Sequence, residues 1–342
     1  MSILGKCSSC GGNVEYSPEL GCLKCTRCSR ETEIETIGDI EVRDIDPVAT
    51  KDIKIRQSGV LKCLSCGASF QGGTSNMSAE CVYCGANIIE EMDVDRGLVP
   101  NAIIPFEISK DKARQILNSW IKDDFYSPRD FKKSNRNIEI ESVYVPVFEY
   151  DYECQTKYNG RLYEYDRDSD GDSVRRTRSV SGVIDTNNLV IYECSNYVTQ
   201  LDFDRIKPYK TDKLRKFDKR YVMGYSVEHP NTDVMEVRDK TKVTLDSQIN
   251  NAIVRYYRYD GYDYMNKEIT YKRIGFKYVL YPIYKIKINY KQKTSYVYMN
   301  GQTGKKSGML PKSGLKIALT ILLSLGAVGI IVAIFILMSR GL

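Results

Sequence analysis

Residues 7–28, "CSSCGGNVEYSPELGCLKCTRC", hold five cysteines that offer two overlapping ways to bind a metal. The first two cysteines form a C-x2-C pair. Cys22, Cys25 and Cys28 then follow at equal spacing, so either the first two or the last two of them can supply a second pair. Two such pairs present four thiolates, the ligand set of a tetrahedral zinc ion bound at about 2.3 Å. The stretch therefore predicts a zinc ribbon and leaves its second pair to be chosen.

A repeat further along the chain makes that choice. At an offset of 56 positions the cysteines of the first cluster fall on a second cluster with the same C-x2-C-x14-C-x2-C spacing, while Cys22 falls on Ser78. Eight cysteines matching at one offset indicate a duplicated module. We therefore predict two Zn²⁺ ions and a spare thiol at Cys22. The predicted ligands are Cys7, Cys10, Cys25 and Cys28 in the first ribbon, and Cys63, Cys66, Cys81 and Cys84 in the second.

The chemistry of four thiolates narrows the role of these sites. A ribbon of about 25 residues buries too little apolar surface to fold alone, so the metal is expected to supply folding energy. Four protein ligands leave no open position for a substrate, which makes each site structural rather than catalytic. Iron in a rubredoxin-like site is the chemical alternative. Disulfides are disfavoured because these cysteines are expected to lie in the reducing cytoplasm.

The C-terminal stretch "IALTILLSLGAVGIIVAIFILM", residues 317–338, contains no charged residue. Its 22 residues can cross a hydrocarbon core of about 30 Å as a helix rising about 1.5 Å per residue. Four lysines lie shortly before it and Arg340 follows it, and this excess of positive charge places the N-terminal side in the cytoplasm. The first residues lack the apolar core of a signal peptide. We expect a single-pass, tail-anchored protein of the cell membrane with a large cytoplasmic part.

The middle of the chain is rich in tyrosine. Of 26 tyrosines, 24 lie between Tyr126 and Tyr298, and tyrosine suits the half-buried surface of a sheet. The predicted fold is therefore two small zinc ribbons (β), a strand-rich α+β domain and one C-terminal transmembrane helix. The expected boundaries are 1–37 for ribbon 1, 38–58 for an acidic linker, 59–95 for ribbon 2, 99–310 for the α+β domain and 317–338 for the membrane helix.

Local patterns predict several elements of this domain. "SKDKARQILNSWIKDDF" reads as an amphipathic helix capped by Ser109, and further helices are expected over 211–222 and 233–256. A strand is expected over 138–154, followed by a hairpin that turns at Asn159-Gly160. His229 is expected at the surface in a turn, and Cys154 and Cys194 are expected to be buried.

Lysines alternate with apolar residues in "YKIKINYKQK", residues 284–293. In one strand this pattern puts every lysine on one face, which is either an ordinary solvated face or a surface that meets anionic lipid. Further lysines lie close to the membrane helix and could belong to the same lipid-facing surface. The candidates for a membrane-facing surface are Lys285, Lys287, Lys291, Lys293, Lys305, Lys306, Lys312 and Lys316.

The order of these segments resembles a known family. "KCSSCGG", "LKCLSCGA", "VPNAIIPFEISKDKARQIL", "VYVPVFEYD" and "YVYMNGQTGK" before a terminal span are similar to the bacterial tail-anchored membrane proteins with TFIIB-type zinc ribbons, the YdjG-like family. Members are often labelled primosomal helicase PriA-like. "GQTGKKS" in this chain lacks the glycine spacing of a Walker A loop. The resemblance implies SPFH-domain or PspA-type protein partners in envelope stress.

Three functions compete on these features. Closed metal sites and a membrane anchor favour an adaptor that recruits cytoplasmic proteins to the membrane. A membrane-tethered nucleic-acid-binding protein is the alternative, although ribbon 2 carries one lysine against three glutamates between Lys62 and Glu91, where phosphate contacts require basic residues. With one histidine in the chain and closed sites, we expect no enzyme.

Overall fold

The computed structural model describes residues 6–35, 38–45, 98–133, 138–167 and 171–340, and the backbone of four further strands at 60–62, 69–71, 76–80 and 87–89. Within these residues the fold is rich in strands. They form sheets of three, eleven and two strands. The strand-rich prediction is confirmed, and a cysteine cluster near the N-terminus and an apolar helix at the C-terminus flank the large sheet.

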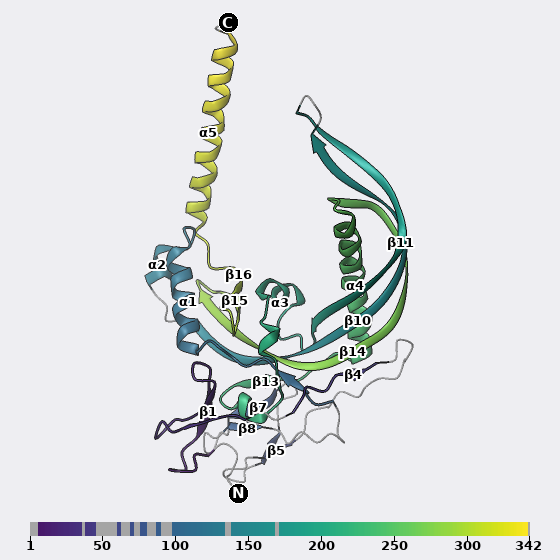
Figure 1. The fold of residues 1–342 in the computed structure, drawn as a ribbon. Coiled ribbons are helices and arrows are strands. Elements are labelled where there is room, and N and C mark those ends of the chain that lie inside the picture. Colours follow the sequence, from purple (N-terminus) through teal and green to yellow (C-terminus); the bar gives the residue numbers. More distant parts are fainter. Residues whose placement is uncertain are drawn as a thin grey trace.

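Two long antiparallel strands form the centre of the large sheet. β10 (Ile138–Arg167) and β14 (Gly261–Tyr290) each run for 30 residues and pair along most of that length. β11 (Ser173–Glu193) pairs with the other edge of β10. Figure 1 shows these three strands as a long curved arm, with α4 (Val234–Tyr257) lying inside the curve.

Shorter strands extend the sheet at the end that is lower in Figure 1. β13 (Ser226–Glu228) pairs in parallel with β10 at Val143 and Tyr144. From Val147 onward, the same edge of β10 pairs with β11 instead. Pro146 lies between these two pairings, where its missing N–H removes no ladder bond. The remaining strands are β4 (Arg43–Asp44), β9 (Ala102–Ile103), β12 (Arg215–Lys216), β15 (Lys293–Asn300) and β16 (Lys306–Gly308). β4 falls within the predicted linker 38–58 and pairs with β14.

Strands from the predicted second ribbon join the same sheet. β7 (Asn76–Glu80) pairs with β13 and with β8 (Asn87–Ile89). β5 (Val60–Lys62) and β6 (Ser69–Gln71) form a separate pair. The four predicted ligands of this ribbon, Cys63, Cys66, Cys81 and Cys84, lie outside the described residues.

Tyrosines fill the interior because their hydroxyls find partners there. On one face of β10, the buried Tyr150 donates a hydrogen bond to the carbonyl of Val234 at 2.5 Å, and the Tyr152 hydroxyl lies 2.6 Å from that of Thr241 in α4. On the other face, Val143, Val145 and Val147 pack in a second core with Phe203 of α3 (Gln200–Ile206). A buried tyrosine ring contributes apolar area, and its satisfied hydroxyl avoids a desolvation cost.

Two of the predicted helices are confirmed. α1 (Lys110–Asp123) begins at Ser109, whose hydroxyl accepts a hydrogen bond from the Lys112 amide, and it buries Ala113, Leu117 and Ile121. α4 matches the helix expected over 233–256 and is capped by Asp233. Cys154 and Cys194 are buried, as expected.

The helix predicted over 211–222 is wrong. This segment forms two short 3₁₀ turns, at Thr211–Lys213 and Lys219–Val222, on either side of β12. β12 pairs with β9 through Arg215 and Lys216. Pairing with a distant strand holds this segment extended, so tertiary contact overrides local helix propensity.

The hairpin turn predicted at Asn159-Gly160 is also wrong. Both residues lie inside β10, and the chain reverses only beyond Arg167. A Cβ atom on Gly160 would lie 2.6 Å from the backbone oxygen of Tyr264, so the glycine allows β14 to approach closely.

His229 is buried rather than exposed, with 7% of its surface accessible. It follows β13, which lies between β10 and β7 inside the sheet. The prediction of a surface position is therefore wrong, because the sequence does not show that this strand is an inner one.

The lysine-rich segment is a hairpin rather than one strand. β14 ends at Tyr290, and Lys291 and Gln292 turn with positive φ angles of 45° and 62° before β15 begins. The prediction of one lysine face continuing to Lys293 is therefore wrong. Of the lysines on β14, Lys285 lies 3.9 Å over the ring of Tyr197, and Lys287 pairs with Glu139 at 3.5 Å.

Two buried carboxyl groups near this end of the sheet make stability depend on pH. Burial raises the pKa of Glu193 to about 7, and burial with the nearby charge of Glu141 raises the pKa of Glu228 to about 7. Both values lie above the ordinary pKa of 4.5, so the folded state binds more protons than the unfolded state between pH 4.5 and 7. The contribution of these two carboxyl groups to stability is therefore full below about pH 4.5 and declines as pH rises towards 7.

We expect Glu193→Gln to remove part of this decline. Its amide oxygen can still accept the hydrogen bond from the Ser195 amide, which is 2.8 Å from the Glu193 carboxylate. Between pH 5 and 7.5 the wild type should lose about 2–3 kcal/mol more free energy of unfolding than the variant, measured by chemical denaturation. Glu139→Gln, at an exposed position on β10, should retain the wild-type slope. Equal slopes for Glu193→Gln and the wild type would contradict this account.

The C-terminal helix α5 (Gly314–Arg340) projects away from the rest of the fold (Figure 1). Its segment Gly314–Ile336 has a mean hydropathy of 2.8 and no buried part, so it is long and apolar enough to cross a membrane. The predicted span is confirmed in this sense of length and composition.

Candidate metal centre

Four cysteines converge at the N-terminal end of the molecule. The Cys7 and Cys28 sulfurs lie 3.7 Å apart, those of Cys10 and Cys25 lie 3.5 Å apart, and all four lie within 4.8 Å of one another. Four sulfurs placed tetrahedrally at about 2.3 Å from a zinc ion are separated by about 3.8 Å. The cluster therefore has the size that one metal ion requires. Cys22 lies outside it, buried on β2 (Cys22–Cys25).

Each pair of candidate ligands is held by a tight turn. In the first, the Gly11 amide donates to the Cys7 carbonyl at 2.9 Å and Gly11 has a φ of 70°. In the second, the Ser29 amide donates to the Cys25 carbonyl at 3.0 Å and Ser29 has a φ of 59°. Gly11 follows the pattern of metal-binding C-x2-C turns, in which glycine readily takes a positive φ. At Ser29 the sequence gives no such signal.

The pKa values of the cysteine thiols are shifted in different directions. Amide hydrogen bonds from Cys28 and Arg27, at 3.5 and 3.4 Å, lower the pKa of Cys25 to about 6. Burial raises the pKa of Cys22 instead. A thiolate is the form that binds metal. An Arg30 amide hydrogen bond lowers the pKa of Cys28, but hydrogen bonding with the Cys10 and Cys25 sulfurs outweighs it and raises this pKa to about 12. The direction of the pKa shift therefore does not separate the clustered cysteines from Cys22. Among the described residues, the four cysteines that converge are the four that the 56-residue repeat selects, and their binding of a metal stays a prediction.

The cysteine cluster is docked onto the large sheet domain. β1 (Val14–Ser17), β2 and β3 (Glu31–Thr32) form a three-stranded sheet around it. The Tyr16 amide donates to the Met223 carbonyl at 3.0 Å, and its hydroxyl donates to the Phe106 carbonyl at 3.3 Å. Tyr16 is 6% exposed and its ring contacts that of Tyr221 at 5.4 Å. These contacts fix the orientation of ribbon 1.

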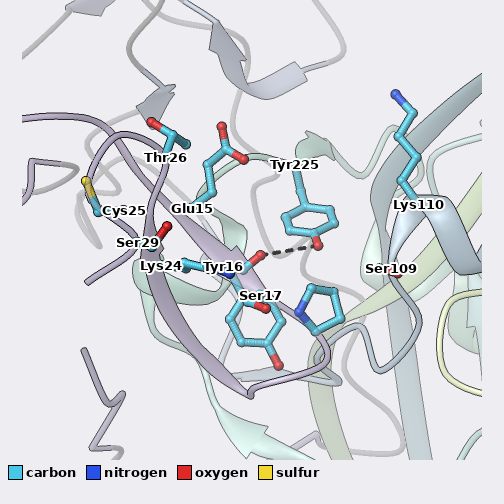
Figure 2. Close-up of a pocket in the computed structure, with 11 residues that line it drawn as sticks. Glu15, Tyr16, Ser17, Lys24, Cys25, Thr26, Ser29, Ser109, Lys110 and Tyr225 are labelled. Carbon is cyan, nitrogen blue, oxygen red and sulfur yellow. Dashed lines mark hydrogen bonds between the residues drawn. The ribbon is translucent and has the colours of Figure 1, made fainter. Parts of the chain in front are cut away.

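A cleft of about 330 Å³ runs along this junction, between ribbon 1 and the start of α1. Figure 2 shows Tyr225 between the two, donating a hydrogen bond to the Tyr16 carbonyl at 3.4 Å, with Ser109 and Lys110 on the α1 side. Glu19 of the ribbon accepts a hydrogen bond from the Ser109 hydroxyl at 2.7 Å. Sequence reasoning missed this junction, because the spacing of cysteines carries no information about which residues lie against the ribbon.

The remaining lysine candidates lie apart from the metal centre. Lys306 lies 5.4 Å over the ring of Trp120. Lys312 pairs with Asp124 at 3.1 Å, and Lys316 donates to the carbonyl of Phe125 at 2.8 Å. Lys305 donates to the carbonyl of Lys207. Lys312 and Lys316 therefore join the base of α5 to the folded domain, while Lys305 and Lys306 make contacts within that domain.

Gly12 is required beside the cluster. An added Cβ would lie 2.9 Å from the Cβ of Arg27, 3.2 Å from the Cys25 sulfur and 3.3 Å from the Cys10 sulfur. We expect Gly12→Ala to push the ligands apart and lower metal affinity at least tenfold, measured by competition with a chelator. Gly326→Ala makes the same change where a Cβ meets nothing within 4 Å, and should leave the affinity unchanged. Unchanged affinity in Gly12→Ala would contradict the geometry.

Fold and site together define a class: a strand-rich protein that carries a four-cysteine cluster able to hold a metal ion and one helix able to span a membrane. No family model and no solved structure matches the chain. The chain is similar to the uncharacterized protein YdjG of Bacillus subtilis (strain 168), with 28% identity over 330 residues that cover 93% of each chain. The similarity covers most of the chain and supports the predicted YdjG-like resemblance.

Proposed function

We propose that the chain is a membrane-anchored adaptor whose cytoplasmic zinc ribbons and sheet domain recruit protein partners to the membrane. The observation that carries the proposal is the docking of a closed four-cysteine cluster onto the large sheet through Tyr16. A closed site has no position for a substrate, and a docked one presents a fixed surface. We assign one Zn²⁺ to each ribbon of the TFIIB type.

The anchor is α5, in this proposal. Its 23-residue apolar segment is fully exposed, and such a surface is stable in lipid rather than in water. Lys305, Lys306, Lys312 and Lys316 precede it, which supports a cytoplasmic N-terminal side. The protein is then single-pass in the cell membrane. The similarity to YdjG-like proteins adds SPFH-domain or PspA-type proteins as proposed partners in envelope stress.

Capture from membranes tests the adaptor. The tagged full-length chain is isolated in detergent from nuclease-treated membranes, and associated proteins are quantified. We expect protein partners that are enriched with the wild type and with Cys22→Ser, and lost with Cys7→Ser, which removes a metal ligand. Partners equally enriched in all three samples, or none above background, would contradict the proposal. Binding that disappears on nuclease treatment would favour the nucleic-acid-binding alternative.

A further inference from the structure

A basic cavity of about 670 Å³ lies at the base of α5. Three segments meet there: the start of α2 (Arg129–Lys133), the turn between β14 and β15, and the first turn of α5. Its charged or hydrogen-bonding side chains include Arg129, Asp130, Tyr290, Lys291, Lys312 and Lys316. Four of these are cations and one is an anion, so the lining carries a formal charge of +3.

The walls of this cavity are held by the fold. The Lys316 ammonium donates to the carbonyls of Phe125 and Ser127 at 2.8 and 2.9 Å, and the Ser313 amide donates to the Tyr126 carbonyl at 2.8 Å. These bonds tie the first turn of α5 to the connection between α1 and α2. The cations are therefore grouped at a defined place, where the apolar helix begins.

The single anion of the lining has fixed partners. The Tyr290 hydroxyl donates to the Asp130 carboxylate at 2.8 Å, and Lys291 lies 3.6 Å from the same oxygen. Lys312 pairs with Asp124 at 3.1 Å. Arg129 is exposed and makes no ion pair with any residue whose position is described here. The cavity thus keeps uncompensated positive charge.

We propose that this cavity binds the phosphate headgroup of an anionic phospholipid. The proposal rests on the anchoring role of α5, which brings the cavity to the level of the headgroups. Phe125 and Leu315, 66% and 81% exposed, place apolar side chains beside the cavity at this level. An anionic leaflet attracts each lysine or arginine that lies near its surface. Four such residues gathered around one cavity are suited to selecting anionic over zwitterionic lipid.

The test uses the full-length chain in a non-ionic detergent, with dihexanoyl phosphatidylglycerol and dihexanoyl phosphatidylcholine as probes. Binding is measured by the shift in melting temperature and by titration. The wild type should bind dihexanoyl phosphatidylglycerol and respond little to dihexanoyl phosphatidylcholine. The double variant Arg129→Gln with Lys291→Asn removes two of the four cations and should weaken that binding at least tenfold. Asparagine is chosen because it tolerates the positive φ at position 291. The charge-retaining Arg129→Lys should bind like the wild type.

Lys157→Gln with Arg161→Gln removes two exposed cations from the distant arm and should leave binding unchanged. Equal responses to the two lipids, or equal losses in both double variants, would overturn the proposal. Full competition by glycerol 3-phosphate at the lipid's own concentration would also overturn it, in favour of a soluble phosphate ligand. Arg129→Gln alone changes one exposed side chain and must weaken binding if the double variant fails to fold. Release of the wild type from membranes by alkaline carbonate would refute the anchor, while lipid binding in detergent remains measurable.

Discussion

Replacing Cys25 with serine is expected to leave the protein with one metal ion fewer per chain than the wild type. The hydroxyl of serine stays protonated and binds zinc weakly, so the site keeps three strong ligands. Cys25 is a candidate ligand whose pKa is lowered to about 6 by amide hydrogen bonds, and its sulfur lies 3.5 Å from that of Cys10. Structural zinc contributes about 10–16 kcal/mol in isolated ribbons, so loss of the ion should also loosen ribbon 1. Metal content after gel filtration measures the effect.

Cys22→Ser is the matched control. Cys22 lies three residues away on the same strand and outside the cluster, so the variant should keep the wild-type metal content. Loss of metal in Cys22→Ser, or full retention in Cys25→Ser, would show that another set of cysteines binds the ion.

Glu149→Ala is expected to lower the free energy of unfolding by about 3–5 kcal/mol. Glu149 is 1% exposed, accepts a hydrogen bond from the Tyr281 hydroxyl at 2.6 Å and pairs with Lys277 at 2.7 Å. Lys277 faces it across the two central strands, β10 and β14. Removing the carboxylate leaves a largely buried ammonium and a buried hydroxyl without this partner, and breaking a buried pair costs far more than the pair itself contributes. Denaturant unfolding of the full chain measures the loss.

Glu153→Ala provides the comparison on the same strand. Glu153 pairs with Arg273 at 3.3 Å, but the two side chains are 41% and 39% exposed. An exposed pair contributes about 0–1 kcal/mol, so this variant should unfold almost like the wild type. Equal losses in the two variants would mean that burial of Glu149 does not govern its contribution.

The spacing of cysteines was enough to predict which four thiols of the first cluster converge. The C-x2-C spacing brings each pair of thiols together in a tight turn, which is a local property of the chain, and the repeat 56 positions later selects Cys25 and Cys28 over Cys22. The capped helix α1 and the apolar helix α5 were also predictable, because a helix cap and a continuous apolar run are each recognised within one short stretch of sequence.

Contacts between distant segments were beyond such reasoning. The segment around Arg215 is extended because it pairs with β9, more than a hundred residues earlier, and Gly160 accommodates a neighbouring strand rather than a turn. The docking of Tyr16 against Phe106 and Tyr221 likewise depends on where the sheet places those residues. The lysine pattern after Tyr284 fits one strand as well as a hairpin, and the two positive φ angles at Lys291 and Gln292 decide between them.

X-ray absorption at the zinc edge of the metal-replete full-length protein tests the central claim most directly. Closed structural sites predict four sulfur ligands at about 2.3 Å and no oxygen or nitrogen ligand. Cys22→Ser should give the same spectrum. A shell containing oxygen or nitrogen at about 2.0–2.1 Å would mean that a ligand position is open or differently filled, and would contradict a structural centre.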